Sequence, residues 1–275
     1  MDELSINARL LADPDDEELS ILGDALQAIG DPRGDLIALQ LAAKPLALDF
    51  GLSFERGWFA LDFEYTAHYL THWEPFAPWI RTIRVRAAGE LLERFVEDLC
   101  RACSHLETLE LKVFGPTNPA EACESIQWAL DASPRLKRFG LRCDNTRVRP
   151  LDHPTVERVD ANMAGAAVIL RSASDFPPVQ GGRWPRVTTF AVHERADITS
   201  LDFARIPSLH TLDLTDVTDG RLDAPAGLFR LIEANRDALG RLRELRLPKL
   251  DDEWLSRLRT ITRDYPLLRT TLDRT

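Results

Sequence analysis

Cysteine is scarce in this chain, with four residues among 275. So few cysteines do not indicate a disulfide-stapled scaffold, which depends on a dense set. The sequence also lacks any apolar run of about 18 residues, so we expect no membrane-spanning helix. Its first residues are acidic and no apolar stretch follows them, so we expect no secretory signal and a cytoplasmic protein.

Signatures of common enzyme chemistries are missing as well. The sequence contains no glycine-rich phosphate loop, no G-x-S-x-G nucleophile motif and no H-E-x-x-H zinc motif. A net charge of −10 argues against a nucleic-acid binder, which needs a basic surface. We therefore predict a protein without catalytic activity, without a cofactor and without a metal.

One histidine pair has the spacing of metal ligands. His68 and His72 are four residues apart and could share a helix face, but Tyr69 stands where the zinc motif has glutamate. Two ligands do not fix a tetrahedral site, and the sequence identifies no third one. We interpret the pair as structural.

A C-x-x-C motif is formed by Cys100 and Cys103. A zinc site needs a second close pair, but Cys123 and Cys143 are 20 residues apart. A redox motif begins a helix, whereas this one ends a predicted helix over residues 90–103. Core cysteines are the favoured interpretation.

The sequence is rich in one repeated phrase. From Leu106 to Leu111, apolar residues hold positions 1, 4 and 6 of six. The other copies have their apolar residues at Ile80, Ile83 and Val85; Leu136, Phe139 and Leu141; Val156, Val159 and Ala161; Val187, Phe190 and Val192; Leu209, Leu212 and Leu214; Leu242, Leu245 and Leu247; and, in a degraded copy, Leu267, Thr270 and Leu272. Successive copies begin 20 to 33 residues apart, which is typical of stacked repeats.

The phrase predicts a strand with one buried face. In an extended segment, positions 4 and 6 point to the same side. No single copy can bury its apolar side, so the copies must stack around one core. Amphipathic segments such as residues 90–103 and 119–132 separate the copies and predict helices, which gives an α/β fold.

The phrase resembles the leucine-rich repeat, L-x-x-L-x-L. The resemblance implies a solenoid over residues 80–275, with parallel strands on its concave face and helices on its convex face. One departure concerns the asparagine or cysteine that follows the third leucine in that family. Phe114, Val217 and Leu250 stand at this position in three of the copies.

Residues 1–50 differ in kind and predict helices. Asp15 and Asp16 are suited to cap a helix over residues 17–29, whose apolar side would include Ile29, and Asp35 could cap the next helix. The segments 12–16 and 30–40 resemble the repeat-companion domain, a helical module ahead of repeat arrays in bacteria such as planctomycetes and myxobacteria. That resemblance implies architecture only. Residues 51–79 read as strand, turn and strand, and we predict an N-terminal cap there.

The outward side of the strands carries the candidate binding site. Positions 3, 5 and 7 of each phrase should point away from the core, and in the first four copies they are net basic. Arginine holds carboxylates through paired hydrogen bonds, so we predict a protein partner bound through an acidic segment. The candidate binding residues are Arg84, Arg86, Lys112, Arg138, Arg142, Arg158, His193 and Asp213.

Three alternatives stay open. The charges could be a solvated face that protects the strands from aggregation, partly neutralised by Glu110 and Asp160. The protein could regulate an enzyme such as a small GTPase, which would need an arginine or asparagine presented on a repeat edge. An immunity-type protein that neutralises a basic toxin would instead need an acidic concave face.

Overall fold

The computed structural model describes residues 2–44, 46, 48, 51–64, 73–88, 96, 98–114, 126–143, 151–162, 166, 169, 184–193, 203, 206–216, 229, 232–233 and 235–272. The pair His68 and His72 lies outside these residues, as does Cys123. Of residues 163–172 the structure describes only Ala166 and Ile169, which are helical and buried.

Ten strands in the described residues form one sheet in sequence order. They are β1 (Leu52–Glu55), β2 (Trp58–Glu64), β3 (Ile80–Ala88), β4 (Thr108–Phe114), β5 (Arg138–Cys143), β6 (Arg158–Asn162), β7 (Thr189–His193), β8 (Thr211–Asp213), β9 (Glu244–Leu247) and β10 (Arg269–Leu272). β1 and β2 form an antiparallel hairpin, and every later strand pairs in parallel with the one before it. The predicted α/β class is confirmed, and so are the two strands and the turn expected between residues 51 and 64.

The repeated phrase stacks in register. Position 4 of each copy pairs with position 4 of the next, so one buried row crosses seven strands. Its members are Ile83, Leu109, Phe139, Val159, Phe190, Leu212 and Leu245. In the degraded last copy, Leu267 is 84% exposed and Thr270 is also exposed, so that copy adds little to the core.

Backbone hydrogen bonds extend the stacking one residue ahead of each strand. The amide of Glu107 donates to the carbonyl of Arg81, and Lys137 and Glu157 continue the ladder from one copy to the next. This ladder fixes the chain just after position 1, which turns into the core. The sequence pattern did not predict this feature, because backbone pairing leaves no mark on residue type.

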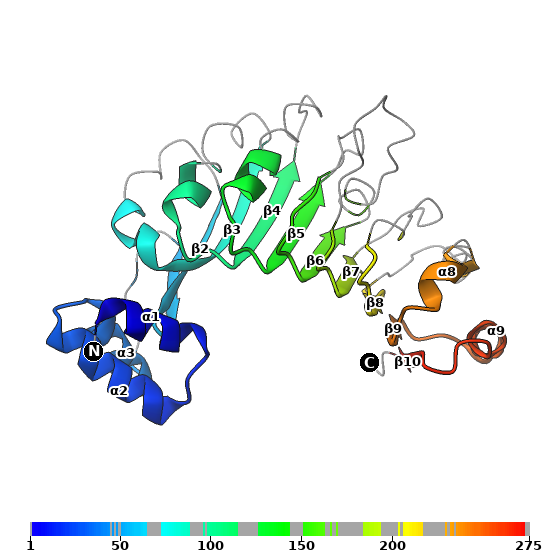
Figure 1. Cartoon of the computed structure of the whole chain (residues 1–275), viewed down its shortest axis with the longest axis horizontal. Helices are drawn as coiled ribbons and strands as arrows, with labels where there is room; N and C mark the ends of the chain where they lie inside the picture. The colour runs from blue at the N-terminus through cyan, green and yellow to red at the C-terminus, as the bar shows by residue number, and fades with distance from the viewer. Residues whose placement is uncertain are drawn as a thin grey trace.

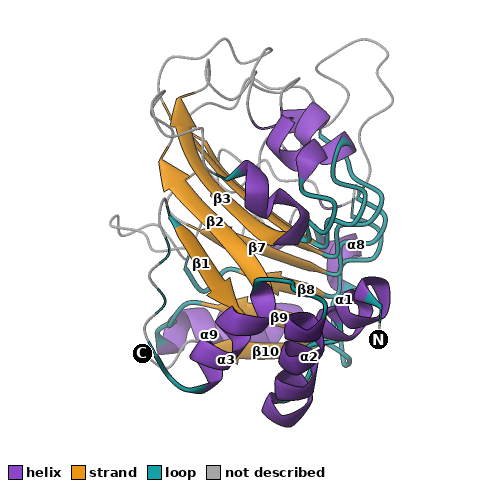
Figure 2. Cartoon of the chain, turned by 90° about the vertical axis from the view of Figure 1, so that its left-hand side faces the viewer, coloured by secondary structure: helices purple, strands orange, loops and turns teal. Residues whose placement is uncertain are grey.

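Helical segments cover the other side of the sheet. Residues 98–102 and 126–131 are helical, followed later by α8 (Arg236–Leu239) and α9 (Asp252–Thr262). Their buried residues, such as Leu99 and Leu130, belong to the same core as the strands. In Figure 1 the strands line the inner side of an arch and the helical segments lie on its outer side. Figure 2 shows the same separation from the end.

Three helices gather at the first end of the sheet: α1 (Glu3–Leu11), α2 (Asp16–Ala28) and α3 (Arg33–Leu41) (Figure 1). Asp15 caps α2 by accepting from the amide of Glu18 at 2.8 Å, as the sequence predicted. Two details were wrong. Asp35 does not cap α3: it lies in the first turn of that helix, whose N-cap residue is Pro32, and the amide of Arg33 donates instead to the Asp31 carboxylate at 2.9 Å. Ile29 is 49% exposed, because α2 ends one residue earlier and the chain turns at Gly30.

A buried arginine joins these helices to the sheet. The Arg33 side chain is fully buried, with Nη2 2.6 Å from the Asp31 carboxylate and Nη1 donating to the Asn7 Oδ1 atom at 2.8 Å. Its guanidinium lies 5.7 Å from the ring centre of Trp58 in β2 and 5.1 Å from that of Trp79, at the end of the 3-10 helix η1 (Glu74–Trp79). Arginine is suited to this place, because its planar group pairs with a carboxylate and stacks on rings at once.

Replacing Arg33 with methionine should cost about 3–5 kcal/mol of unfolding free energy, because the buried Asp31 carboxylate loses its partner. Urea unfolding measures this. The control is Arg9→Met, which breaks an exposed pair with Glu18 and should cost less than about 1 kcal/mol. Equal losses in the two variants would contradict the role of Arg33.

The middle of the buried row should be equally sensitive. Phe139 is fully buried on the central strand β5, so Phe139→Ala should lower the unfolding free energy by about 3–5 kcal/mol. Leu267→Ala, on the exposed last copy, should cost less than about 0.5 kcal/mol. A comparable cost at both positions in urea unfolding would show that the row is not the core.

Candidate functional site

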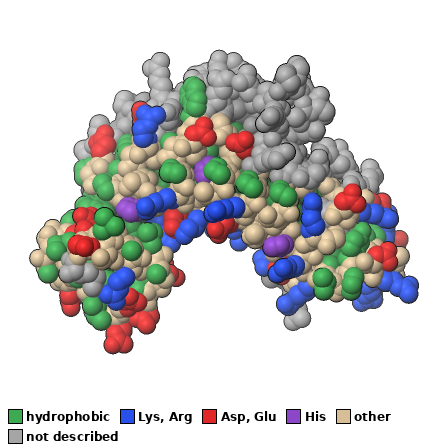
Figure 3. Space-filling view, viewed as in Figure 1, with side chains coloured by type: hydrophobic (Ala, Val, Ile, Leu, Met, Phe, Trp, Pro, Cys, Tyr) green, Lys and Arg blue, Asp and Glu red, His purple; other side chains and the backbone are tan. Residues whose placement is uncertain are grey.

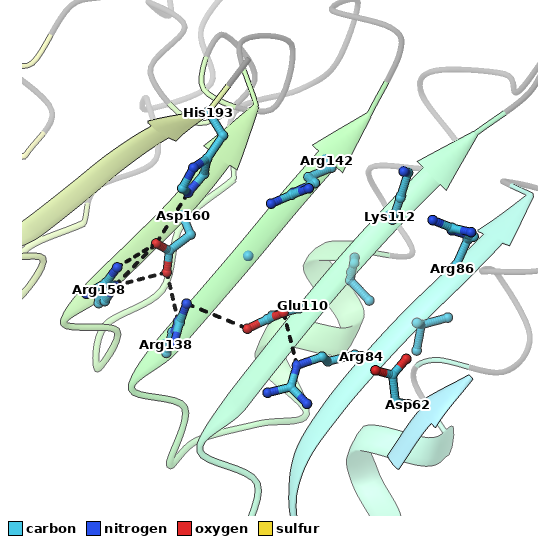
Figure 4. A pocket seen from close by; sticks show the side chains of 13 residues that line it. Asp62, Arg84, Arg86, Glu110, Lys112, Arg138, Arg142, Arg158, Asp160 and His193 are labelled. Carbon is cyan, nitrogen blue, oxygen red and sulfur yellow. Dashed lines mark hydrogen bonds and ion pairs between the residues drawn. The ribbon is translucent and has the colours of Figure 1, made fainter. Parts of the chain in front are cut away.

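The outward side of strands β2 to β7 forms a depression of about 600 Å³. Figure 3 shows charged side chains gathered in the hollow of the arch, and Figure 4 shows the residues that line the depression. Seven of the eight predicted binding residues lie there; Asp213 does not. The complete lining is Asp62, Arg84, Val85, Arg86, Glu110, Leu111, Lys112, Arg138, Gly140, Arg142, Arg158, Asp160 and His193.

The depression is positively charged within an acidic chain. Six lining side chains are arginine or lysine and three are aspartate or glutamate, an excess of three positive charges with His193 neutral. The whole chain carries −10. The first part of the chain, residues 2–44, holds ten acidic and three basic residues, so much of the negative charge lies on α1 to α3.

Three of the predicted arginines belong to a chain of ion pairs across β3 to β6. Glu110 lies between Arg84 at 3.2 Å and Arg138 at 3.8 Å. Asp160 then lies between Arg138 at 2.8 Å and Arg158 at 2.9 Å (Figure 4). One alternative from the sequence was that Glu110 and Asp160 partly neutralise the basic face. For these three arginines the structure shows such a neutralisation.

A glycine makes room for this chain of ion pairs. A Cβ atom on Gly140 would lie 2.9 Å from the Cγ atom of Glu110, which is closer than carbon atoms in contact allow. Gly140 is buried even though its position faces outward. The glycine thus lets the Glu110 side chain lie across β5 toward Arg138.

The buried carboxylate of Asp160 is held in its charged form. Burial opposes ionisation, but hydrogen bonds from His193 and Arg158 and the charge of Arg138 together lower the pKa of Asp160. In return, Asp160 raises the pKa of His193, and Asp216 adds to that effect. His193 Nε2 is 3.6 Å from Asp160 and Nδ1 is 2.7 Å from Asp216. The more distant Asp160 matters more, because it is buried while Asp216 is mostly exposed.

A second set of cations lies toward the carboxyl ends of the strands. Arg86, Lys112 and Arg142 hold position 7 of three neighbouring strands; Arg86 pairs in register with Lys112, and Lys112 with Arg142. All three side chains are exposed and line the depression (Figure 4). Neither Arg86 nor Lys112 forms an ion pair with any side chain that the structure describes. We call these three residues the cation row.

Asp213 takes part in a separate cluster. It lies in β8, accepts from the amide and hydroxyl of Thr215, and pairs with Arg246 at 3.3 Å. Arg246 also pairs with Glu244 at 2.9 Å. The Asp213 carboxylate is thus occupied by its neighbours in the fold.

The C-x-x-C cysteines lie in the core. Both are buried near the end of the helix before β4. Burial raises the pKa of Cys100 to about 12 and raises that of Cys103 further, so both thiols are protonated at neutral pH. In the described part of the chain no three histidine, cysteine, aspartate or glutamate side chains come together as a metal site would require.

The sequence analysis did not predict the roles of two acidic residues, Asp62 and Glu107. Asp62 lines the depression because β2 continues the sheet in register with β3, although its sequence lacks the repeated phrase. Glu107, at position 2, bridges Arg81 and Lys137 at 2.7 Å each. Burial opposes its charge, but hydrogen bonds from Lys137 and Arg81 lower the pKa of Glu107. The sequence contains a signal that could have predicted this bridge: position 2 alternates in charge, with Arg81, Glu107 and Lys137 in successive copies.

Comparison with known proteins adds no assignment to this geometry. No protein-family profile matches the chain, and the search of curated proteins finds no match either. Among the described residues, no helix combines the length and apolar character needed to cross a membrane.

The pairing of His193 predicts a pH-dependent stability. Because folding raises the pKa of this ring above its ordinary 6.5, its stabilisation is present in full below that value and is lost as pH rises through the folded-state pKa. His193→Gln should therefore lower the unfolding free energy by roughly 1 kcal/mol at pH 5.5, and by clearly less at pH 9.

His105 serves as the control, because its contribution to stability should depend on pH in the opposite direction to that of His193. Burial, and then the nearby Arg135, lower the pKa of this ring, so its protonation opposes folding. The cost of His105→Gln should be smaller at pH 5.5 than at pH 9. Urea titrations at both pH values measure the two slopes, and a His193 cost that grows with pH would contradict the assignment.

Proposed function

We propose that the protein is a non-catalytic scaffold that binds another protein in the depression on the concave side of its sheet. The proposal includes a finer assignment of the fold: a helical repeat-companion module at residues 1–50, a cap at 51–79 and a leucine-rich-repeat solenoid at 80–275. The stacked phrase, the parallel strands and the helical segments on the outer side support that assignment. We keep the cytoplasm as the proposed location.

The observation that carries the proposal is the local reversal of charge. A depression with three excess positive charges, inside a chain of −10, attracts an acidic partner and repels a basic one. The proposed partner is therefore a protein with an acidic segment. This favours our proposal over the toxin-neutralising alternative, which needs an acidic concave face.

The test compares two variants with the same change of charge. The first neutralises the depression with Arg84→Gln, Arg86→Gln, Lys112→Gln and Arg142→Gln. The second is the control and removes three arginines and one lysine that are exposed near the C-terminal end: Arg241→Gln, Lys249→Gln, Arg259→Gln and Arg263→Gln. Arg138 is left intact, because it lies between Glu110 and Asp160.

Each protein is used to capture partners from the native host, and the captured proteins are quantified by mass spectrometry. The depression variant should lose a specific acidic partner by at least about tenfold, which corresponds to about 1.4 kcal/mol of binding free energy. The control should retain that partner, and both variants should unfold near the wild-type temperature. Equal capture by the two variants would refute binding in the depression.

A further inference from the structure

The two ends of the arch carry opposite charge. Residues 2–44, with helices α1 to α3, hold ten acidic and three basic residues, a net charge of −7. Residues 235–272, with α9, hold nine basic and six acidic residues, a net charge of +3. Figure 1 shows α1 to α3 and α9 at opposite ends of the arch. One copy of the chain therefore presents two surfaces of opposite charge that do not meet within that copy.

The acidic surface is the outer face of α2. Glu17, Ile21 and Asp24 are spaced four and three residues apart, so they share one face of this helix. All three are exposed, and Ile21 is 52% exposed. Neither Glu17 nor Asp24 forms an ion pair with any side chain that the structure describes. We call these three residues the head face.

The three basic residues among residues 2–44 do not pair with the head face. Arg9 pairs with Glu18 at 2.7 Å, and Arg33 is buried against Asp31. Lys44 follows α3 and forms no ion pair with a described side chain. The carboxylates of the head face are therefore available to a cation from outside the module.

The basic surface is formed by the last turns of α9 and the loop that follows it. Arg259 and Arg263 are four residues apart, exposed, and on the same side of the helix. Neither forms an ion pair with a described side chain, not even with Asp264, the next residue in the chain. Leu267, in the loop before β10, is 84% exposed. We call Arg259, Arg263 and Leu267 the tail face.

The tail face matches the head face better than the depression does. Stable protein interfaces bury apolar side chains at their centre and surround them with polar ones. The head face and the tail face each combine an exposed apolar side chain, Ile21 or Leu267, with two charges of one sign. The depression is also basic, but the apolar residues of its lining, Val85 and Leu111, are almost fully buried.

We propose that the head face of one copy binds the tail face of a second copy, so that the protein associates head to tail. The carboxylates of Glu17 and Asp24 then meet Arg259 and Arg263, and Ile21 packs against Leu267. Because the contact joins two different surfaces, every bound pair keeps one free head and one free tail, and association continues beyond the dimer.

This inference goes beyond the proposed function and does not depend on it, because neither face includes a residue of the depression. It adds a consequence for binding. Each added copy brings another depression into the assembly, so a partner with several acidic segments would be held at more than one of them.

Sedimentation velocity of the full chain tests the association. At about 0.05 M salt the sedimentation coefficient of the wild type should rise with protein concentration, and at about 0.5 M salt it should return to that of the monomer. The head variant carries Glu17→Lys and Asp24→Lys, and the tail variant carries Arg259→Glu and Arg263→Glu. Each should associate with itself at least about tenfold more weakly than the wild type, because its changed face repels the other face.

Mixing the two variants gives the sharpest result. The head variant keeps an intact tail face and the tail variant an intact head face, so an equimolar mixture should form a one-to-one dimer and nothing larger. A chain with all four changes has a basic head and an acidic tail, and it should associate as the wild type does. Both recoveries also require that the changed chains fold.

The depression variant, in which the cation row and Arg84 are neutralised, is the control and should associate as the wild type does. Association that this variant loses and the tail variant keeps would place the head face in the depression and overturn the assignment. A wild type that stays monomeric at low salt, or a mixture without a dimer, would overturn the proposal as a whole.

The proposed function is tested separately. The control variant of the capture experiment lacks Arg259 and Arg263, so it should be monomeric and still capture the acidic partner. Loss of self-association therefore leaves the proposed function standing, and equal capture by the two capture variants leaves head-to-tail association standing.

Discussion

The structure depends on the in-register stacking of its parallel strands. Each phrase has only three apolar residues, and one copy alone would leave them in water. Stacking turns them into continuous rows, in which Ile83, Leu109 and Phe139 have no exposed surface. The same register fixes the outward side, because a strand that buries positions 4 and 6 must present positions 3, 5 and 7.

This constraint sets like charges side by side and so creates the candidate site. Parallel strands bring equal positions to within about 5 Å, where two cations repel each other. At positions 3 and 5 the carboxylates of Glu110 and Asp160 offset that repulsion by lying between arginines. At position 7, Arg86 and Lys112 stand next to each other with no such carboxylate among the described side chains. The register thus forces these two cations together, and the acidic partner that we propose is one that would relieve their repulsion.

The helical module and the sheet are joined by a different kind of contact. Arg33 places a charge in the interior, which is costly unless every hydrogen bond and the charge itself are satisfied. Asp31 and Asn7 satisfy it from the module, while Trp58 and Trp79 cover it from the sheet side. The contact has fixed geometry, so it defines one orientation of the module.

The sequence predicted what depends on local periodicity. The phrase identified the buried rows, the strand positions and seven of the residues that line the depression. It could not predict contacts between distant segments, such as Arg33 on Trp79 or His193 on Asp216. Asp62 was missed because β2 joins the sheet without the repeated phrase. The role of Gly140 was missed because it depends on the Glu110 side chain of the neighbouring strand, which needs the space that a Cβ atom would fill. The wrong expectations for Ile29 and Asp35 concern the end of α2 and the start of α3. Helix boundaries are the part of a helix that a sequence pattern places least accurately, by one or two residues.

Cysteine cross-linking tests the stacking most directly. Thr82 pairs with Thr108, and Thr189 with Thr211, on neighbouring strands, so Thr82→Cys with Thr108→Cys and Thr189→Cys with Thr211→Cys should each form a disulfide under mild oxidation. Thr82→Cys with Lys112→Cys, four residues out of register, should not, since about 13 Å of strand separates the two positions. Mass spectrometry of the folded proteins gives the answer. A disulfide in the out-of-register pair, or its absence from both in-register pairs, would contradict the account.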